Sequence, residues 1–117
     1  MEDTTEATVA SPPRSRSWFV VDLPEELDVA SMPALRQRLT TLILSGRVRL
    51  VLNAAPLDFV DATGIGALVY AANLARARGG WIRLIGVKQK HMRLLMILRL
   101  GRMLPIHEDL RDALREA

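Results

Sequence analysis

The sequence predicts an α/β domain with a mostly parallel sheet of about four strands and about four helices. Short apolar runs alternate with longer segments in which apolar residues recur at helical spacing. Half of the 117 residues are hydrophobic, so a chain of this length can build one core. Only 4% are aromatic, which predicts a largely aliphatic core. Alternating strands and helices are typical of a parallel sheet covered by its crossover helices.

The chain divides into a tail and one domain. Residues 1–17 are rich in Ser, Thr, Pro and acidic residues, so we expect a flexible N-terminal tail with at most a short strand around Ala7–Ala10. The domain is expected to span residues 18–117. There is no Cys, which excludes disulfides and is compatible with a reducing cytoplasm.

The first strand and first helix follow from apolar patterning and capping residues. Trp18–Leu23 is a β-prone apolar run that Pro24 ends. After an acidic connector, a helix is expected over 31–44, because its leucines and isoleucine recur on one face. Ser31 is placed to cap this helix, and Gly46 to end it in the left-handed conformation.

The middle of the chain predicts two strands around a long helix. Residues 47–53 contain consecutive apolar residues, as expected for a strand covered on both faces. A loop over 54–60 leads to a helix over 63–78, which two glycines end. Residues 81–85 form the next short strand.

The C-terminal part predicts a helix, an edge strand and a closing helix. The helix over 88–100 carries apolar residues at most angles and is ended by the glycine that follows it. A final strand over 103–106 contains a proline, which suits a sheet edge. The helix over 108–116 is expected to turn Leu110 and Leu114 inward.

The chemistry of the chain concentrates in Asp58–Gly66, which reads DFVDATGIG and lies between a strand and a helix. The first amides of a helix have no internal partner, and the peptide dipole makes that end partly positive. Thr63 could carry a phosphoryl group whose oxygens accept from those amides. The alternative is that Asp61 or Thr63 is only a helix cap. Gly64 and Gly66 are expected to permit close approach of another backbone.

The helix after Thr63 has two apolar stripes on opposite sides. The first is assigned to the core and consists of Ile65, Leu68, Val69 and Ala72. The second consists of Ala67, Tyr70, Ala71 and Leu74. Either neighbouring helices cover this second stripe, or it is a docking surface beside Thr63.

Catalytic, metal and nucleic-acid sites are not indicated. His91 and His107 lack a neighbouring carboxylate cluster in the sequence, and Asp58 with Asp61 would make a weak cation site. No phosphate-cradling Gly-rich loop with a Lys occurs. The net charge of +3, without aromatic residues in the basic regions, does not favour nucleic acid. We expect no cofactor, no bound metal and no enzymatic activity, and no membrane partner because no apolar run could span a bilayer.

Three segments together resemble the STAS domain of bacterial anti-sigma factor antagonists. They read LVLNAAPLDFVDATGIGALV, LARARGGWIRLIG and MLPIHEDLRDAL. The acidic connector, Pro24–Asp28, is similar to that family's Gly-Glu-Leu-Asp element. The most specific match is Asp61–Gly66, which is similar to the family's Asp-x-Ser/Thr-Gly-x-Gly core.

The resemblance implies a regulated binding protein in the cytoplasm. Such antagonists bind an anti-sigma factor that is also a serine/threonine protein kinase, and so free a sigma factor. The kinase phosphorylates the Ser or Thr of the core motif, the antagonist is released, and a phosphatase restores it. By position, Thr63 would be the phosphorylation site. The implied partner-binding residues are Asp28, Asp61, Ala62, Thr63, Gly64, Gly66, Ala67, Tyr70 and Leu74.

Other functions remain as alternatives. The chain could be a STAS-type scaffold subunit of a transporter or signalling complex without phospho-switching, in which case Thr63 is a plain helix cap. An enzyme that uses Asp58, Asp61 and Thr63 is a weaker alternative, because no base accompanies the hydroxyl. Self-association as a homodimer, through the first strand or the helix over 88–100, also stays open.

Overall fold

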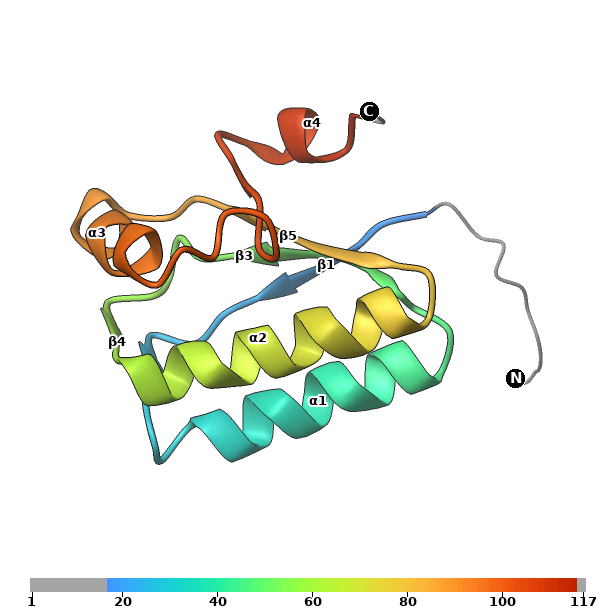
Figure 1. Ribbon diagram of the computed structural model, residues 1–117, viewed down its shortest axis with the longest axis horizontal. Helices are drawn as coiled ribbons and strands as arrows, with labels where there is room; N and C mark the ends of the chain where they lie inside the picture. The colour runs from blue at the N-terminus through green and yellow to red at the C-terminus, as the bar shows by residue number, and fades with distance from the viewer. Residues whose placement is uncertain (1–16, 116–117) are drawn as a thin grey trace.

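The computed structural model describes residues 17–115 and contains a four-stranded parallel sheet (Figure 1). Its strands lie in the order β1-β3-β5-β6, and each pairs in parallel with its neighbour. They are β1 (Phe19–Asp22), β3 (Arg49–Asn53), β5 (Trp81–Ile85) and β6 (Ile106–His107). The predicted fold class is therefore confirmed. The strand considered around Ala7–Ala10 lies outside the described residues, and the tail boundary stays a prediction.

Four helices surround the sheet. The two long helices, α1 (Met32–Leu44) and α2 (Ala62–Ala77), lie side by side on one face (Figure 1). The short α4 (Leu110–Ala113) lies on the opposite side of the sheet, against β5 and β6. α3 (Gln89–Ile97) connects β5 to the loop before β6 and lies at the same end of the sheet as the start of α2. Within residues 17–115, no helix is long and apolar enough to cross a bilayer.

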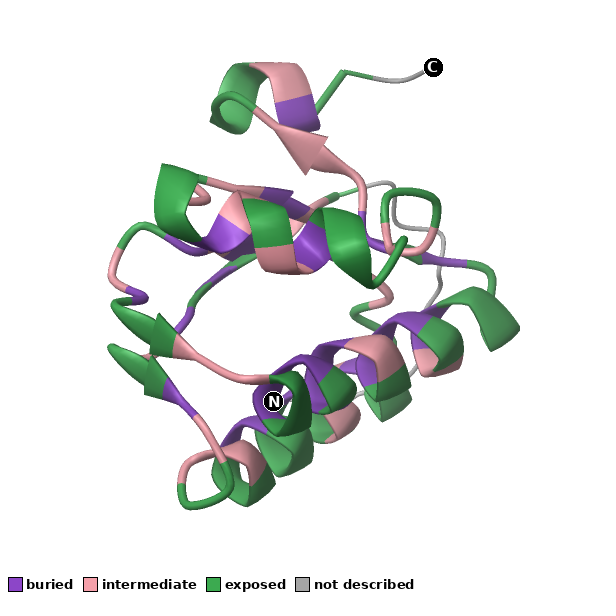
Figure 2. Ribbon diagram, turned by 60° about the vertical axis from the view of Figure 1, so that its left-hand side comes forward, coloured by how far each residue is buried: buried purple, intermediate pink, exposed green. Residues whose placement is uncertain are grey.

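The core lies between the sheet and the two long helices. Strand residues of alternate positions point into it and are almost fully buried, namely Val21, Leu50, Leu52, Ile82 and Leu84. α1 contributes Leu35, Leu39 and Ile43, which recur at helical spacing as the sequence predicts. Figure 2 shows buried residues, in purple, along the inner faces of the two long helices and on the strands. The predicted aliphatic core is confirmed.

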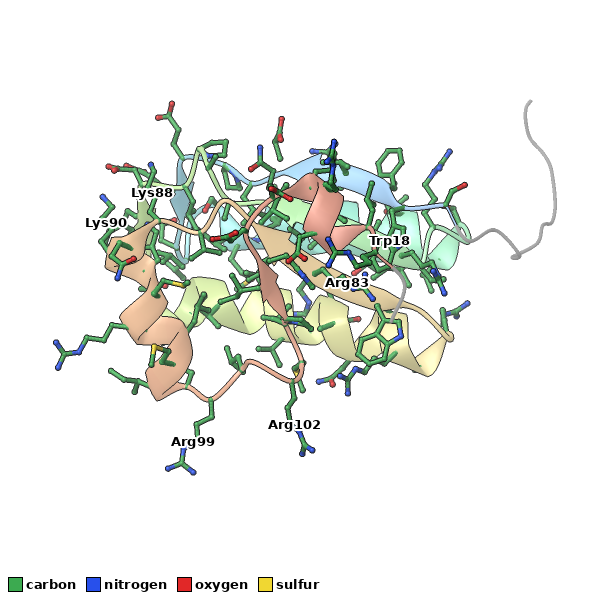
Figure 3. The ribbon with its side chains drawn as sticks, turned by 90° about the horizontal axis from the view of Figure 1, so that it is seen from above. Trp18, Arg83, Lys88, Lys90, Arg99 and Arg102 are labelled. Atoms are coloured by element: carbon green, nitrogen blue, oxygen red, sulfur yellow. The ribbon has the colours of Figure 1, made fainter. Side chains whose placement is uncertain are left out.

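The other face of the sheet is held by arginine contacts. The Arg83 guanidinium lies 4.3 Å from the centre of the Trp18 ring, and the two side chains lie close together in Figure 3. Arg83 also donates to the carbonyl oxygen of Ala113, which ties α4 to this face. α4 therefore covers the sheet through backbone acceptors and the buried Ala113, while Leu110 and Leu114 remain 39% exposed. The expectation that these two leucines point inward is wrong.

A second, two-stranded sheet was not predicted. β2 (Glu26–Leu27) lies in the expected acidic connector, and β4 (Phe59–Val60) lies in the expected loop before the motif. The two strands pair in parallel, with Leu27 opposite Val60. Two-residue strands carry no readable alternation, so only their pairing across about 30 residues of chain defines them. This small sheet brings the connector against the motif.

The end of α3 and the last strand also differ from the sequence expectation. α3 ends at Ile97, before the expected boundary at residue 100. Arg99 takes the left-handed conformation with φ of 55° just after this helix, two residues before the glycine that was expected to end it. The last strand begins at Ile106, after Pro105, because proline has no amide hydrogen to donate to the sheet.

Candidate functional site

Thr63 lies in the first turn of α2 with its side chain exposed. The residue before this helix, Asp61, is the N-cap, and its Oδ1 accepts a hydrogen bond from the Gly64 amide at 2.8 Å. Among the described residues, no hydrogen bond engages the Thr63 hydroxyl. The capping role therefore belongs to Asp61. Thr63 is left as an open hydroxyl at the partly positive end of a 16-residue helix.

The first turn of α2 sits directly on the end of β2. A Cβ atom added to Gly64 would lie 2.2 Å from the Leu27 carbonyl oxygen, a distance that no real side chain tolerates. The Asp61 amide donates to the same oxygen at 3.3 Å. Close backbone approach at Gly64 is thus confirmed. The same expectation for Gly66 is wrong, because a Cβ there would meet nothing within 4 Å.

Asp28 follows Leu27 directly, so the Gly64–Leu27 contact brings its segment beside Thr63. Its Oδ1 accepts from the amides of Ala30 at 3.0 Å and Ser31 at 3.1 Å. The Ser31 amide is the largest cause that holds the pKa of Asp28 below its ordinary value. Asp28 is therefore a fixed negative charge at the start of α1.

Ser31 orders this loop in an unexpected way. It occupies the N-cap position of α1 but makes no side-chain bond to the helix. Its hydroxyl donates instead to the Glu26 carbonyl at 2.7 Å and accepts from the Asp28 amide at 3.0 Å. Ser31, which was expected to cap the helix, therefore stabilises the loop that carries Asp28.

Asp58, the other carboxylate of the motif, forms an ion pair with α3. Its Oδ1 lies 2.6 Å from Nζ of Lys90 on α3. The hydrogen bond from Lys90 is the largest cause that holds the pKa of Asp58 below its ordinary value. This ion pair links the loop before the motif to α3. Of the two carboxylates in the motif, only Asp61 faces the first turn of α2.

The second stripe of α2 is mostly covered by α1. Ala67 is 3% exposed and Ala71 is fully buried, because α1 packs along this side of α2. Leu74 is half-buried. Tyr70 is 39% exposed, and the Arg36 guanidinium from α1 stacks 3.9 Å from its ring centre. Of the two alternatives for this stripe, coverage by a neighbouring helix holds for the two alanines, since small residues here allow close helix packing.

The exposed surface around Thr63 therefore includes fewer residues of α2, and more residues of the neighbouring loops, than the sequence predicts. The exposed motif positions on α2 are Ala62, Thr63 and Gly66. Two further apolar side chains are exposed on the segments next to the start of α2, Val29 after Asp28 at 69% exposure and Phe59 on β4 at 50%. Sequence reasoning missed both, because neither belongs to a periodic pattern. We call these residues with Asp28, Asp61 and Tyr70 the Thr63 face.

Each of the two histidines has a hydrogen-bonding partner outside the Thr63 face. His91 is buried on α3, with Nε2 3.2 Å from the Leu57 carbonyl oxygen. His107 on β6 has Nδ1 3.0 Å from Asp112 Oδ2. Among residues 17–115, no cluster of three or more His, Cys, Asp or Glu side chains could hold a metal ion. The Thr63 face offers a nucleophilic hydroxyl, a helix terminus and exposed apolar groups.

The chain was compared with known families, sequences and structures. The STAS domain family matches residues 10–113. The anti-sigma-B factor antagonist of Bacillus subtilis is 31% identical over 78 residues, which cover 66% of this chain and 70% of that protein.

Solved structures of two kinds of protein share the fold at low identity. The anti-sigma factor antagonist SpoIIAA in its unphosphorylated form matches with a TM-score of 0.65 and 22% identity, over 83% of this chain and 84% of that one. SpoIIAA from Bacillus has also been solved in a phosphorylated form. A sulfate transporter family protein from Wolinella succinogenes matches with a TM-score of 0.65 and 18% identity, over 83% and 81% of the two chains. The family match spans nearly the whole chain, and on that ground this protein belongs to the STAS domain family.

Proposed function

We propose that this protein is an anti-sigma factor antagonist. It binds an anti-sigma factor of the serine/threonine protein kinase type, releases a sigma factor, and is switched off by phosphorylation of Thr63. The observation that carries the proposal is the exposed, unbonded Thr63 hydroxyl in the first turn of α2, in a chain 31% identical to an anti-sigma-B factor antagonist. The role needs no catalysis by the protein itself.

The Thr63 face supplies the contacts that such a partner would use. Its exposed apolar surface is formed by Ala62, Gly66, Tyr70, Val29 and Phe59. The half-buried Leu74 extends this surface along α2. Asp28 and Asp61 supply charge at its border. Gly64 and Ala67 are buried and contribute indirectly, because their packing sets the position of α2. A kinase must also reach the Thr63 oxygen, and its exposure supports that access.

Electrostatics explains why a phosphoryl group would end the interaction. Phosphorylation adds a charge of about −1.5 to −2 at neutral pH. Free amides at the helix terminus would donate hydrogen bonds to the phosphoryl oxygens and offset part of this charge. The negative charges of Asp28 and Asp61 at the border of the same surface would repel it. Three additional oxygens would also stand where a partner packs against Ala62 and Gly66. A loss of about 3 kcal/mol would weaken binding more than a hundredfold. A phosphatase that removes the group would restore binding.

A binding and phosphorylation assay with a purified kinase-type anti-sigma factor tests this proposal. We expect wild type and Thr63→Ala to bind, and only wild type to gain phosphate on incubation with ATP. Thr63→Glu is expected to lose most binding. The matched control is Thr41→Glu, because Thr41 is also exposed but lies near the far end of α1. Equal binding by Thr63→Glu and Thr41→Glu would contradict the switch, and phosphate incorporation into Thr63→Ala would contradict the site.

The scaffold alternative gives a different result. A STAS-type subunit of a transporter or signalling complex would use the same face as a permanent interface. The likeness to a sulfate transporter family protein concerns the fold alone. Stable co-purification with a membrane protein, unchanged in a Thr63→Ala variant and without phosphate on Thr63, would favour the scaffold.

A further inference from the structure

The end of α3 carries exposed apolar and basic side chains that the proposed function does not use. Met96 is 74% exposed, Ile97 is 65% exposed and Leu98 is 38% exposed. On a helix, Arg93 shares one face with Met96 and Ile97, at spacings of three and four residues. We define the α3 tip as these residues with the two arginines that follow, namely Arg93, Met96, Ile97, Leu98, Arg99 and Arg102.

The segment that carries the tip contains basic residues and no acidic ones. Residues 88–107 contain five basic residues, at 88, 90, 93, 99 and 102, and no Asp or Glu. Lys90 is paired with Asp58. Within the described range 17–115, none of the three tip arginines takes part in an ion pair. Figure 3 shows Arg99 and Arg102 projecting away from the body of the domain on the same side. The tip is thus an apolar surface with uncompensated positive charge at its border.

The backbone holds this arrangement in place. Arg99 adopts φ of 55°, a left-handed conformation that glycine accepts at lower cost. The Arg102 carbonyl accepts from Arg76 Nη2 at 2.6 Å, which fixes the loop after the helix. Gly101, two residues after Arg99, could have supplied the left-handed position. A long cationic side chain instead stands next to Ile97 and Leu98.

The charge distribution selects among occupants. A second copy of the chain would bring three arginines against the same three arginines, so a symmetric contact through the tip is disfavoured. A partner must instead be anionic and accept flexible aliphatic and thioether groups without a shaped pocket. An anionic bilayer surface has both properties, since its phosphates lie above a fluid apolar layer. Arginine side chains are long enough to reach those phosphates while the apolar groups enter.

We propose that the α3 tip binds the surface of membranes rich in anionic phospholipids. Met96, Ile97 and Leu98 enter the interface, and Arg93, Arg99 and Arg102 contact lipid phosphates. The sequence-based expectation of no membrane partner considered only spanning segments, and surface binding needs none. The tip shares no residue with the Thr63 face, so binding to an anti-sigma factor and binding to a membrane can be measured separately.

Vesicle flotation with the full chain tests the proposal. The probes are vesicles of equal parts phosphatidylglycerol and phosphatidylcholine, and vesicles of phosphatidylcholine alone. Wild type is expected to float only with the anionic vesicles and to be released at high salt, because ion screening weakens phosphate contacts. Thr63→Glu is expected to float as wild type does.

Two double variants separate the apolar and charged contributions. Met96→Ser with Ile97→Ser, and Arg99→Gln with Arg102→Gln, are each expected to weaken binding at least about tenfold. The control is Arg38→Gln with Arg111→Gln, which removes the same charge from exposed positions on α1 and α4. This control is expected to change binding less than about threefold. Circular dichroism of each variant establishes that it is folded.

Three outcomes overturn the proposal. One is the absence of wild-type binding to anionic vesicles at low salt, which would leave an acidic protein surface as the occupant of the tip. Another is an equal loss of binding in the control and in the tip arginine variant, which would show that binding depends on the net charge of the protein and not on the tip. The third is unchanged binding in folded tip variants.

Discussion

Gly64 on α2 packs directly on the carbonyl oxygen of Leu27 on β2, and this contact joins the two halves of the Thr63 face. The contact is possible only without a side chain, since the nearest atom is backbone and cannot rotate away. Thr63 and Asp28 are the respective neighbours of these residues along the chain. The position of the hydroxyl relative to Asp28 therefore depends on a single glycine.

Replacing Gly64 by alanine should destabilise the protein. The added methyl group would force α2 away from β2, and overpacking of this kind costs about 2 kcal/mol. Urea denaturation at neutral pH measures the change. Gly66→Ala is the matched control, because that position is helical and open. It should stabilise by up to about 1 kcal/mol, since alanine is the better helix former. Similar effects of both substitutions would contradict the packing described for Gly64.

The ion pair between Asp58 and Lys90 should make stability depend on pH in the acid range. The folded-state pKa of Asp58 is held below its ordinary value by Lys90. The pair therefore contributes stability above the unfolded pKa of about 3.9, and this contribution is lost as pH falls through the lowered folded-state pKa. The difference in urea midpoint between wild type and Asp58→Asn, measured at low salt, should be positive at pH 6 and vanish in strong acid.

The size of this pH effect should be small, because both side chains are more than half exposed. Lys90→Gln is the companion variant and should reproduce the Asp58→Asn profile. A difference that persists unchanged below the lowered pKa of Asp58 would show that Asp58 acts through packing instead of charge. Added salt should reduce the difference at pH 6, since exposed charges are screened.

Arg99→Gly should raise stability while it weakens binding to anionic vesicles. Glycine adopts the left-handed conformation without the steric cost that arginine bears, which predicts a gain of about 1 kcal/mol by thermal or urea unfolding. Arg93→Gly makes the same chemical change inside α3, where φ is helical, and should instead lose about 1 kcal/mol. A loss of stability on Arg99→Gly would indicate that its side chain supports the fold.

Much of the chain was predictable because its local patterns agree with the fold. The strand over 81–85 and the left-handed Gly46 were predicted as the structure has them, and α1 and α2 were predicted to within one residue at each end. Their apolar positions recur with the period of the element, and glycines end both helices. α3 was predicted to end three residues too late, because nothing local shows that Arg99 would take the left-handed conformation.

The sequence alone determined the α/β class, the order of the main strands and helices, and the position of Thr63 beside a helix N-terminus. Those features depend on residues close together in the chain, whose periodicity and capping chemistry are readable. Only the tertiary structure decided that Asp61 caps the helix, that Lys90 neutralises Asp58, and that α1 buries Ala67 and Ala71. Each of these depends on which groups compete for a contact once the chain is packed, and local sequence does not encode that competition.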